Sequence, residues 1–277
     1  MSLTPQDEAQ CIEAHKFTTI SRARKLVGQQ TFRLLNDISR KQYLLFHPVS
    51  VSQFTTLDEG RFDGREIIPK KTRLTYDTPT STLIVKIMAS PKHDTAAALL
   101  AFKISSKLES FGVPATAFLP VGAARRQGKY TAKQPDASFK PSFRGENGWP
   151  SLVIESGLAE SLVQLRRDAA WWLTNSDGQV RIALLASMQK DDRSIVVEVW
   201  EMKAQQPDRG QRVTRSGSKP TPTLSQEITI ARSGEVRGGP LVLEFEKMLA
   251  RQPGQGEGDV VFSTEELRVW AGAVWAA

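Results

Sequence analysis

The feature that most constrains the fold is an alternation of strand-like and helix-like segments between residues 83 and 200. Residues 83–88 form a nearly continuous apolar run, which is typical of a buried strand. Apolar side chains then recur at helical spacing, with Asp94 as the capping residue and Gly112 at the helix end. The alternation continues with strands over 114–121, 136–139 and 151–155, a helix over 157–173, and a strand pair over 180–187 and 194–200. This order predicts an α/β (α+β) fold with a mixed central sheet flanked by helices.

The N-terminal part reads as an extension of this core. Residues 1–20 are polar, and we expect them to be loosely held. Residues 21–40 have the pattern of an amphipathic helix with a basic outer face, which lies on the domain or reaches a partner. Two strand-like stretches follow at 42–46 and 50–57. We therefore assign residues 1–70 to an N-terminal extension and residues 71–277 to the core domain.

The C-terminal part begins with a stretch that has no periodicity. Residues 203–226 contain five Lys or Arg and only one acid, together with Pro, Gly and Ser, and predict a basic mobile loop. Residues 240–249 are apolar enough to be buried, either as a strand or as a helix. Ser263 is placed to cap a final helix.

The amino-acid composition indicates which kinds of partner and which cellular compartment the protein is expected to have. The 277-residue chain carries a formal charge of +7, and such an excess favours a polyanionic partner, although a generally basic surface is the alternative. Its single cysteine, Cys11, excludes an intramolecular disulfide. The N-terminus lacks the features of a signal peptide, and no apolar run is long enough to span a membrane. We expect an intracellular protein, in the nucleus or the cytoplasm, without a membrane partner. Assembly as a homodimer stays open.

Two carboxylates stand out in the core. Asp136 begins one predicted strand, and Glu155 ends the next. Carboxylate oxygens are the ligands that hard divalent ions such as Mg²⁺ prefer. Held beside a phosphodiester, such an ion stabilises developing charge and lowers the pKa of an attacking water. The arrangement therefore points to an acidic metal site.

The helix that follows Glu155 has two distinct faces. At 100° per residue, Leu158, Leu162, Leu165, Ala169 and Trp172 form an apolar face. Glu160, Gln164, Arg167 and Trp171 fall together on the opposite face. This polar face borders the carboxylate pair if Glu155 lies at the strand end. A solvated helix face is the alternative interpretation.

The ordered set of these segments resembles the PD-(D/E)XK superfamily, most closely its Uma-type endonuclease branch and fungal relatives of that branch. The matching pieces are Ser90-Pro91 before a helix, Pro135-Asp136, the strand that ends in Glu155, and the helix that carries Trp171-Trp172. The resemblance implies a restriction-endonuclease-like core, with Asp136 and Glu155 as ligands of Mg²⁺ or Mn²⁺. It also implies a hydrolase that binds DNA and cleaves its phosphodiester bonds.

The chain departs from the superfamily pattern at one position. The pattern places a lysine two residues after the second acid, and Gly157 stands there instead. In the Uma-type branch the lysine lies on the following helix, where this chain has Arg166-Arg167. Arg167 can hold a phosphate but stays protonated and cannot act as a base. Lys86 and Lys133 are the substitutes. A catalytically inactive nuclease-fold protein that binds nucleic acid or another protein is therefore the alternative function.

A basic segment surrounds Asp136 in the sequence. Between residues 122 and 146, six Lys or Arg stand against two acids. Basic side chains placed around a nuclease-like cleft suit a nucleic-acid backbone, whereas a solvated basic loop is the alternative. The candidates for nucleic-acid contact are Arg125, Arg126, Lys129, Lys140 and Arg144, with Gln164, Arg167 and Lys133 assigned to the catalytic site itself.

Overall fold

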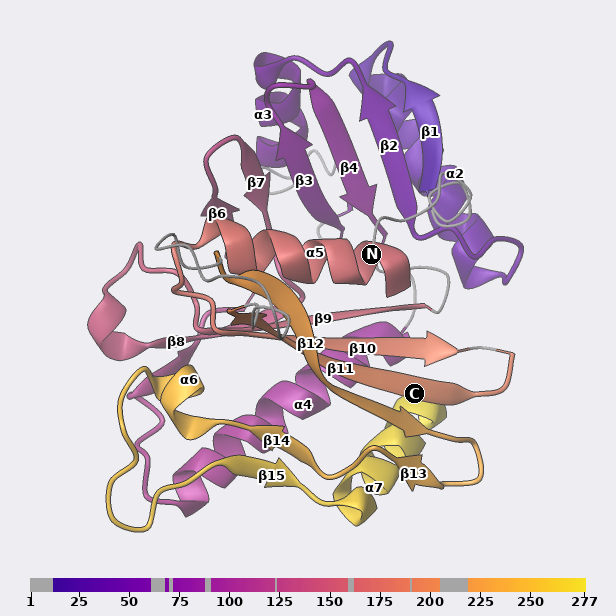
Figure 1. The fold of residues 1–277 in the computed structure, drawn as a ribbon. Coiled ribbons are helices and arrows are strands. Elements are labelled where there is room, and N and C mark those ends of the chain that lie inside the picture. The colour runs from indigo at the N-terminus through magenta and orange to yellow at the C-terminus, as the bar shows by residue number, and fades with distance from the viewer. Residues whose placement is uncertain are drawn as a thin grey trace, which may run out of the picture.

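A computed structural model describes residues 12–60, 68–69, 72–87, 91–122, 124–158, 162–189, 191–204 and 219–277 (Figure 1). These residues form two large sheets and one small one. The helices α5 (Leu162–Asn175), α4 (Pro91–Ser110) and α7 (Thr264–Ala276) pack against the larger sheet. Among the described residues, none of the helices combines the length and hydropathy needed to span a membrane.

The first sheet has six strands in the order β1-β2-β4-β3-β7-β6. Only β1 and β2 are parallel; the other neighbouring strands are antiparallel. The core of this unit contains buried residues of the helices α2 and α3 and of the strands β2, β3 and β4. The elements are β1 (Ile12–Lys16), α2 (Ile20–Leu35), β2 (Tyr43–His47), α3 (Val51–Glu59), β3 (Arg73–Asp77), β4 (Thr82–Lys86), β6 (Arg126–Gln127) and β7 (Thr131–Lys133).

The second sheet has seven strands in the order β13-β12-β11-β10-β9-β8-β5. Here β9 and β10 are parallel and are connected by α5, whereas the other neighbours are antiparallel. The strands are β5 (Phe118–Pro120), β8 (Ala137–Pro141), β9 (Leu152–Leu158), β10 (Ile182–Gln189), β11 (Ser194–Lys203), β12 (Thr221–Ile230) and β13 (Val236–Arg237). Strands β14 (Leu241–Leu243) and β15 (Val260–Phe262) form the small sheet, next to α6 (Phe245–Leu249), and a short 3₁₀ turn covers Ser142–Arg144.

The two faces of the second sheet carry different cores. Ile154 and Leu184 contribute to the core with α4 and α7. Val153 and Leu185, one position along each strand, pack with Leu165 and Trp172 of α5. Figure 1 shows α5 between the two sheets, with α4 and α7 beyond the second sheet. Side chains on the α5 face of β9 therefore point toward the first sheet.

This mixed α/β architecture, with mixed sheets flanked by helices, confirms the predicted fold class and is consistent with a restriction-endonuclease-like fold. The single central sheet of the prediction is replaced by two. The first sheet combines strands from both sides of residue 70. The proposed division of the chain at that residue therefore does not coincide with the edge of a sheet.

Three local predictions were wrong. The stretch 50–57, predicted as a strand, lies in the helix α3 (Val51–Glu59) and its N-cap, because Ser50 and Gln53 make a capping box that starts the helix. The helix predicted from residue 157 begins at Leu162, and Gly157 and Leu158 complete β9. Within the predicted mobile loop, residues 221–226 belong to β12, which pairs with β11. Residues 205–218 of that loop lie outside the described residues.

Other expectations changed less. Residues 12–16 of the polar N-terminus form β1, which pairs with β2, whereas residues 1–11 lie outside the described residues. The apolar stretch 240–249, open between strand and helix, contains β14 and then α6. The final helix begins as expected, since Ser263 and Glu266 form its capping box.

Candidate active site

The two acids singled out by the sequence lie next to each other on the second sheet. Asp136 immediately precedes β8, and Glu155 lies within β9. These strands are antiparallel, with Ala137 opposite Ile154. Continuing that register by one residue brings Asp136 beside Glu155 on the face covered by α5. Both carboxylates are buried, with side chains only 1% exposed.

A lysine from the first sheet joins the two acids. Lys86 is the last residue of β4, and its side chain is 5% exposed. Its Nζ lies 2.8 Å from Oδ2 of Asp136 and 3.1 Å from Oε2 of Glu155. The two sheets therefore meet at one ammonium that donates hydrogen bonds to both carboxylates.

Other groups hold the carboxylates in place. The indole Nε1 of Trp172 donates to Oε1 of Glu155 at 2.8 Å. The backbone N and the Oγ of Ser156 lie 2.8 and 3.2 Å from Oδ2 of Asp136. Arg73 adds a second cation, since its Nε lies 3.8 Å from Oδ1 of Asp136 and donates to the Pro135 carbonyl at 3.1 Å. Each acid is thus oriented by more than one donor.

Burial and the neighbouring charges change the pKa values of Glu155 and Lys86. Burial raises the pKa of Glu155 to about 7, although the Lys86 ammonium acts in the opposite direction. Burial also works against the charge of Lys86, but the carboxylates of Asp136, Glu155 and Asp168 raise its pKa overall. A protonated lysine and a glutamate that can exchange a proton near neutral pH therefore stand side by side.

An ion pair between a lysine of β7 and an aspartate of α5 lies beside this cluster. Lys133 forms a buried ion pair with Asp168, and its Nζ lies 6.0 Å from the ring centroid of Trp171. Gln164 donates to Asp168 at 2.9 Å. Asp168 and Lys133 both contribute to the electrostatic environment of Glu155. The predicted site residues Gln164 and Lys133 are therefore brought close to the acids through Asp168.

The expectation for the polar face of α5 is met in part. Leu165, Ala169 and Trp172 are buried as predicted, but Gln164 is buried too and bonds Asp168 instead of facing water. Arg167 is half-buried on the helix, and Glu160 lies outside the described residues. The neighbouring arginine of the predicted pair, Arg166, binds Glu198 of β11 through Nε and Nη2 at 2.5 to 3.1 Å.

The five basic candidates for nucleic-acid contact differ in their surroundings. Lys129 is exposed, and Arg126 is half-buried on β6. Arg125 forms an ion pair with Asp58 and lies over the ring of Phe54. Lys140 is buried and donates to the carbonyls of residues 145 and 146, and Arg144 donates to those of residues 149 and 179. Contact with nucleic acid stays a prediction for all five.

The sequence prediction missed Trp172 and Asp168 as members of the site. Trp172 fills the core, as its apolar face suggests, and its indole N–H also needs a partner once it is buried. The need of a buried indole N–H for an acceptor was the only feature of the sequence that indicated its bond with Glu155. Asp168 stands four residues after Gln164, a spacing that brings side chains together on a helix. Arg73 gave no signal, since it precedes Asp136 by 63 residues.

The donors present suit a divalent cation, although they are few. Two carboxylates converge, and the ammonium between them occupies a position where the protein already stabilises positive charge. Among the residues that the structure describes, no group of three or more His, Cys, Asp and Glu side chains is arranged to hold a metal ion. An ion bound by Asp136 and Glu155 would therefore complete its coordination with water, as Mg²⁺ commonly does.

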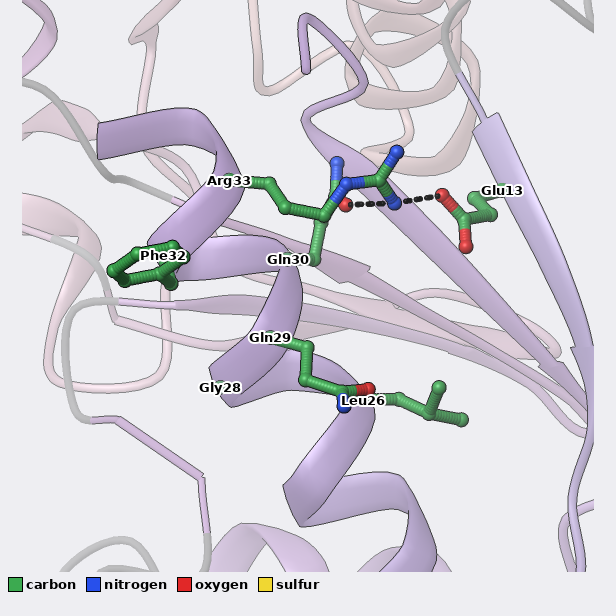
Figure 2. Close-up of a pocket in the computed structure, with 7 residues that line it drawn as sticks. All are labelled: Glu13, Leu26, Gly28, Gln29, Gln30, Phe32 and Arg33. Atoms are coloured by element: carbon green, nitrogen blue, oxygen red, sulfur yellow. Dashed lines mark hydrogen bonds and ion pairs between the residues drawn. The ribbon is translucent and has the colours of Figure 1, made fainter. Parts of the chain in front are cut away.

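A pocket beside α2 lies apart from this cluster. It encloses about 450 Å³ and is lined by Leu26, Phe32 and Arg33, among others. Figure 2 shows Arg33 reaching toward Gln30 and Glu13, with which it bonds at 3.1 and 3.2 Å. The ionic groups of the pocket are thus already paired, and it shares no residue with the acid cluster.

The fold and the cluster define a mixed α/β protein with a buried acid–lysine site between two sheets. No protein-family model matches the chain, and no curated protein sequence does. Among solved structures, the chain is similar to the crystal structure of a "putative nuclease belonging to DUF820" from Anabaena variabilis ATCC 29413. That likeness has 14% sequence identity and a TM-score of 0.45, and it covers 81% of this chain and 99% of the other.

Proposed function

We propose that this protein is a nuclease that uses Mg²⁺ or Mn²⁺ to hydrolyse phosphodiester bonds of DNA. The observation that carries the proposal is the convergence of Asp136 and Glu155 on Lys86, at 2.8 and 3.1 Å. The PD-(D/E)XK pattern, which the sequence resembles, consists of two metal-binding acids and a lysine. Lys86 supplies the amine that is absent at Gly157, from a strand of the other sheet.

The proposed roles follow from the contacts. Asp136 and Glu155 would hold the metal, which when bound activates water and stabilises charge on the phosphate. Trp172 and Ser156 keep the two carboxylates oriented. Lys86 would leave its position between the acids and stabilise negative charge on the scissile phosphate, for which a flexible ammonium is suited. Glu155 must be ionised to bind a cation, and proximity to the cation favours that state.

The substrate would reach the site past the basic segment before β8. Of the five predicted contacts, Lys129 is exposed and so is best placed for a phosphate backbone, whereas Arg125, Arg126 and Arg144 are half-buried and Lys140 is buried. Arg126 donates one hydrogen bond, to the Arg125 carbonyl at 3.3 Å, whereas Arg125 forms an ion pair with Asp58, and Lys140 and Arg144 each donate to two carbonyls. We propose Lys129 and Arg126 as the DNA contacts of this segment, and a structural role for the other three.

The experiment is a cleavage assay on plasmid and linear DNA with Mg²⁺ or Mn²⁺. We expect Asp136→Asn and Glu155→Gln each to lower the cleavage rate on the order of 10²- to 10³-fold, as loss of a group that stabilises transition-state charge does. Glu198→Gln is the matched control, because Glu198 is a buried glutamate on the same face of the same sheet. Absence of cleavage with either metal, or equal loss in the control, contradicts the proposal.

A second candidate is a nuclease-fold protein that binds nucleic acid or a protein without cleaving. The observation that favours it is the closure of the cluster, since Lys86 fills the space between two acids that are each 1% exposed. It predicts DNA binding that weakens steeply with salt and no turnover. Calorimetry separates the two candidates, because Mn²⁺ binding that is lost in Asp136→Asn favours the nuclease.

A further inference from the structure

A second pocket lies beside the turn that connects β10 to β11 and is separate from the acid cluster. It encloses about 380 Å³ between that turn, the turn that connects β12 to β13, and the helix α7. Figure 1 shows these three elements together near the C-terminus. Helix α7 packs on the face of the second sheet opposite to α5. The pocket therefore shares no residue with the acid cluster.

Arginines from all three elements line this pocket. They are Arg193 of the β10–β11 turn, Arg232 of the β12–β13 turn, and Arg268 of α7. Arg268 binds Glu265 through two of its guanidinium nitrogens. In the part of the chain that the structure describes, neither Arg193 nor Arg232 has an acidic partner. Arg193 and Arg232 therefore bring to the pocket two guanidinium groups that form no ion pair among the described residues, although Asp192 precedes Arg193 in the turn.

One wall of the pocket fixes part of this charge in place. Trp275 of α7 lies under two cations, with Arg193 at 5.6 Å and Lys92 at 5.5 Å from its ring centroid. A guanidinium held against an indole loses little freedom when it binds a ligand. Ser233 adds a hydroxyl to the lining. Guanidiniums with a nearby hydroxyl form the donor set that recognises phosphate oxygens.

We propose that this pocket binds a phosphate group of a nucleic-acid strand, as a contact separate from the acid cluster. The choice of nucleic acid rests on the proposed function, whereas the preference for phosphate rests on the arginines alone. The pocket is larger than one phosphate, so it also accommodates the adjoining sugar. A strand held at this pocket extends the electrostatic contact of the protein beyond the acid cluster and its basic segment.

Gly272 offers a way to block the pocket without removing any of its charged residues. It lies on the exposed side of α7 and lines the pocket, and a Cβ added there meets no atom within 4 Å. Gly272→Glu introduces a carboxylate among the arginines. Gly272→Gln has the same size without the charge, and Gly272→Ala reports the effect of higher helix propensity alone.

The experiment measures binding of a fluorescein-labelled DNA duplex and of a labelled single strand, by anisotropy in EDTA over a series of salt concentrations. We expect Gly272→Glu and the double variant Arg193→Ala/Arg232→Ala each to weaken binding about tenfold. The slope of log Kd against log salt should fall by about 1 for each phosphate that the variant protein no longer binds. Arg237→Ala, an exposed arginine of β13 outside the pocket, should change binding much less.

Equal weakening in Arg237→Ala and the double variant would mean a general charge effect and would overturn the proposal. So would equal effects of Gly272→Glu and Gly272→Ala, or the absence of binding to either DNA. Cleavage keeps the two proposals apart. If Asp136→Asn loses cleavage but the pocket variants bind DNA normally, only the pocket proposal fails. If the pocket variants lose DNA binding but the wild-type protein never cleaves DNA, only the proposed activity fails.

Discussion

Glu155 and Glu198 are two buried glutamates on the same face of the second sheet, and their surroundings are closely parallel. Leu185 of β10 is paired with both of them, with Glu155 on β9 and Glu198 on β11. Each accepts a hydrogen bond from an indole, Trp172 at 2.8 Å or Trp200 at 2.7 Å. Each also binds a cation, Lys86 or Arg166.

The difference between the two sites lies in how charge is shared. Arg166 offers two nitrogens to the two oxygens of Glu198, which is the bidentate pairing that neutralises one carboxylate. Lys86 instead divides one ammonium between Glu155 and Asp136. The Nε of Arg73 lies 3.8 Å from Oδ1 of Asp136. Arg166 approaches a second carboxylate only at 4.0 Å, that of the exposed Glu227, so the Glu198 pair is close to one-to-one. At the Glu155 site two buried carboxylates share one ammonium, whose place a metal ion would take under the proposed function.

Removing the cation should have the largest effect at both sites. Lys86→Met and Arg166→Met each leave a buried carboxylate without its ionic partner, a change that costs about 3–5 kcal/mol of unfolding free energy. The measurement is chemical denaturation in EDTA and then in Mn²⁺. We expect Mn²⁺ to restore stability to Lys86→Met but not to Arg166→Met. Equal recovery, or none in either variant, would remove the distinction between the sites.

The second-largest difference between the two sites should appear in how the free energy of unfolding depends on pH. The pKa of Glu155 is raised from 4.5 to about 7 in the folded protein, so between these values the folded state holds a proton that the unfolded state has lost. Stability contributed by this group is therefore full below about pH 4.5 and falls as the pH rises toward 7. A shift of this size corresponds to roughly 3 kcal/mol.

Urea denaturation across this pH range checks the assignment in the metal-free protein. Glu155→Gln should flatten the decline, because its amide does not titrate. Glu198→Gln should leave the decline in place. A wild-type curve that is level or rises over the same range would mean that Glu155 is ionised throughout, which contradicts the raised pKa.

Loss of the indole hydrogen bond should have the smallest effect of the three. Trp172→Phe removes the N–H donor to buried Glu155, and hydrogen bonds to charged groups are worth about 1.5–3 kcal/mol. Trp200→Phe removes the equivalent donor to Glu198, but Arg166 still binds both oxygens of that carboxylate. We therefore expect a larger stability loss for Trp172→Phe, measured by thermal unfolding. A larger loss for Trp200→Phe would mean that the two indoles play different roles from those assigned here.

Much of the second sheet was predictable because its strands and helices carry strong local patterns. The buried strand β10 begins with a continuous apolar run at 182–186, and α5 has an apolar stripe. Asp136 and Glu155 were recognisable because both fall at the ends of such predicted strands. Helix α3 was missed because its nine residues have a weak pattern and its start depends on a capping box.

The rest of the site could not be read from local patterns. Lys86 stands 50 residues before Asp136 and was only one of two substitutes for the missing lysine. The choice between Lys86 and Lys133 depends on how the first sheet packs against α5, since Lys133 pairs with Asp168 instead. Buried charge partners of this kind depend on tertiary packing, which single-sequence periodicity does not encode.

The most direct test of the account is a crystal structure of the protein soaked with Mn²⁺ and measured for anomalous scattering. We predict a peak within coordination distance of Asp136 and Glu155, with Lys86 moved away from between them, and no peak at Glu198. A structure without a peak at the acid pair, in which Lys86 still bridges the two carboxylates, would contradict the metal-dependent function.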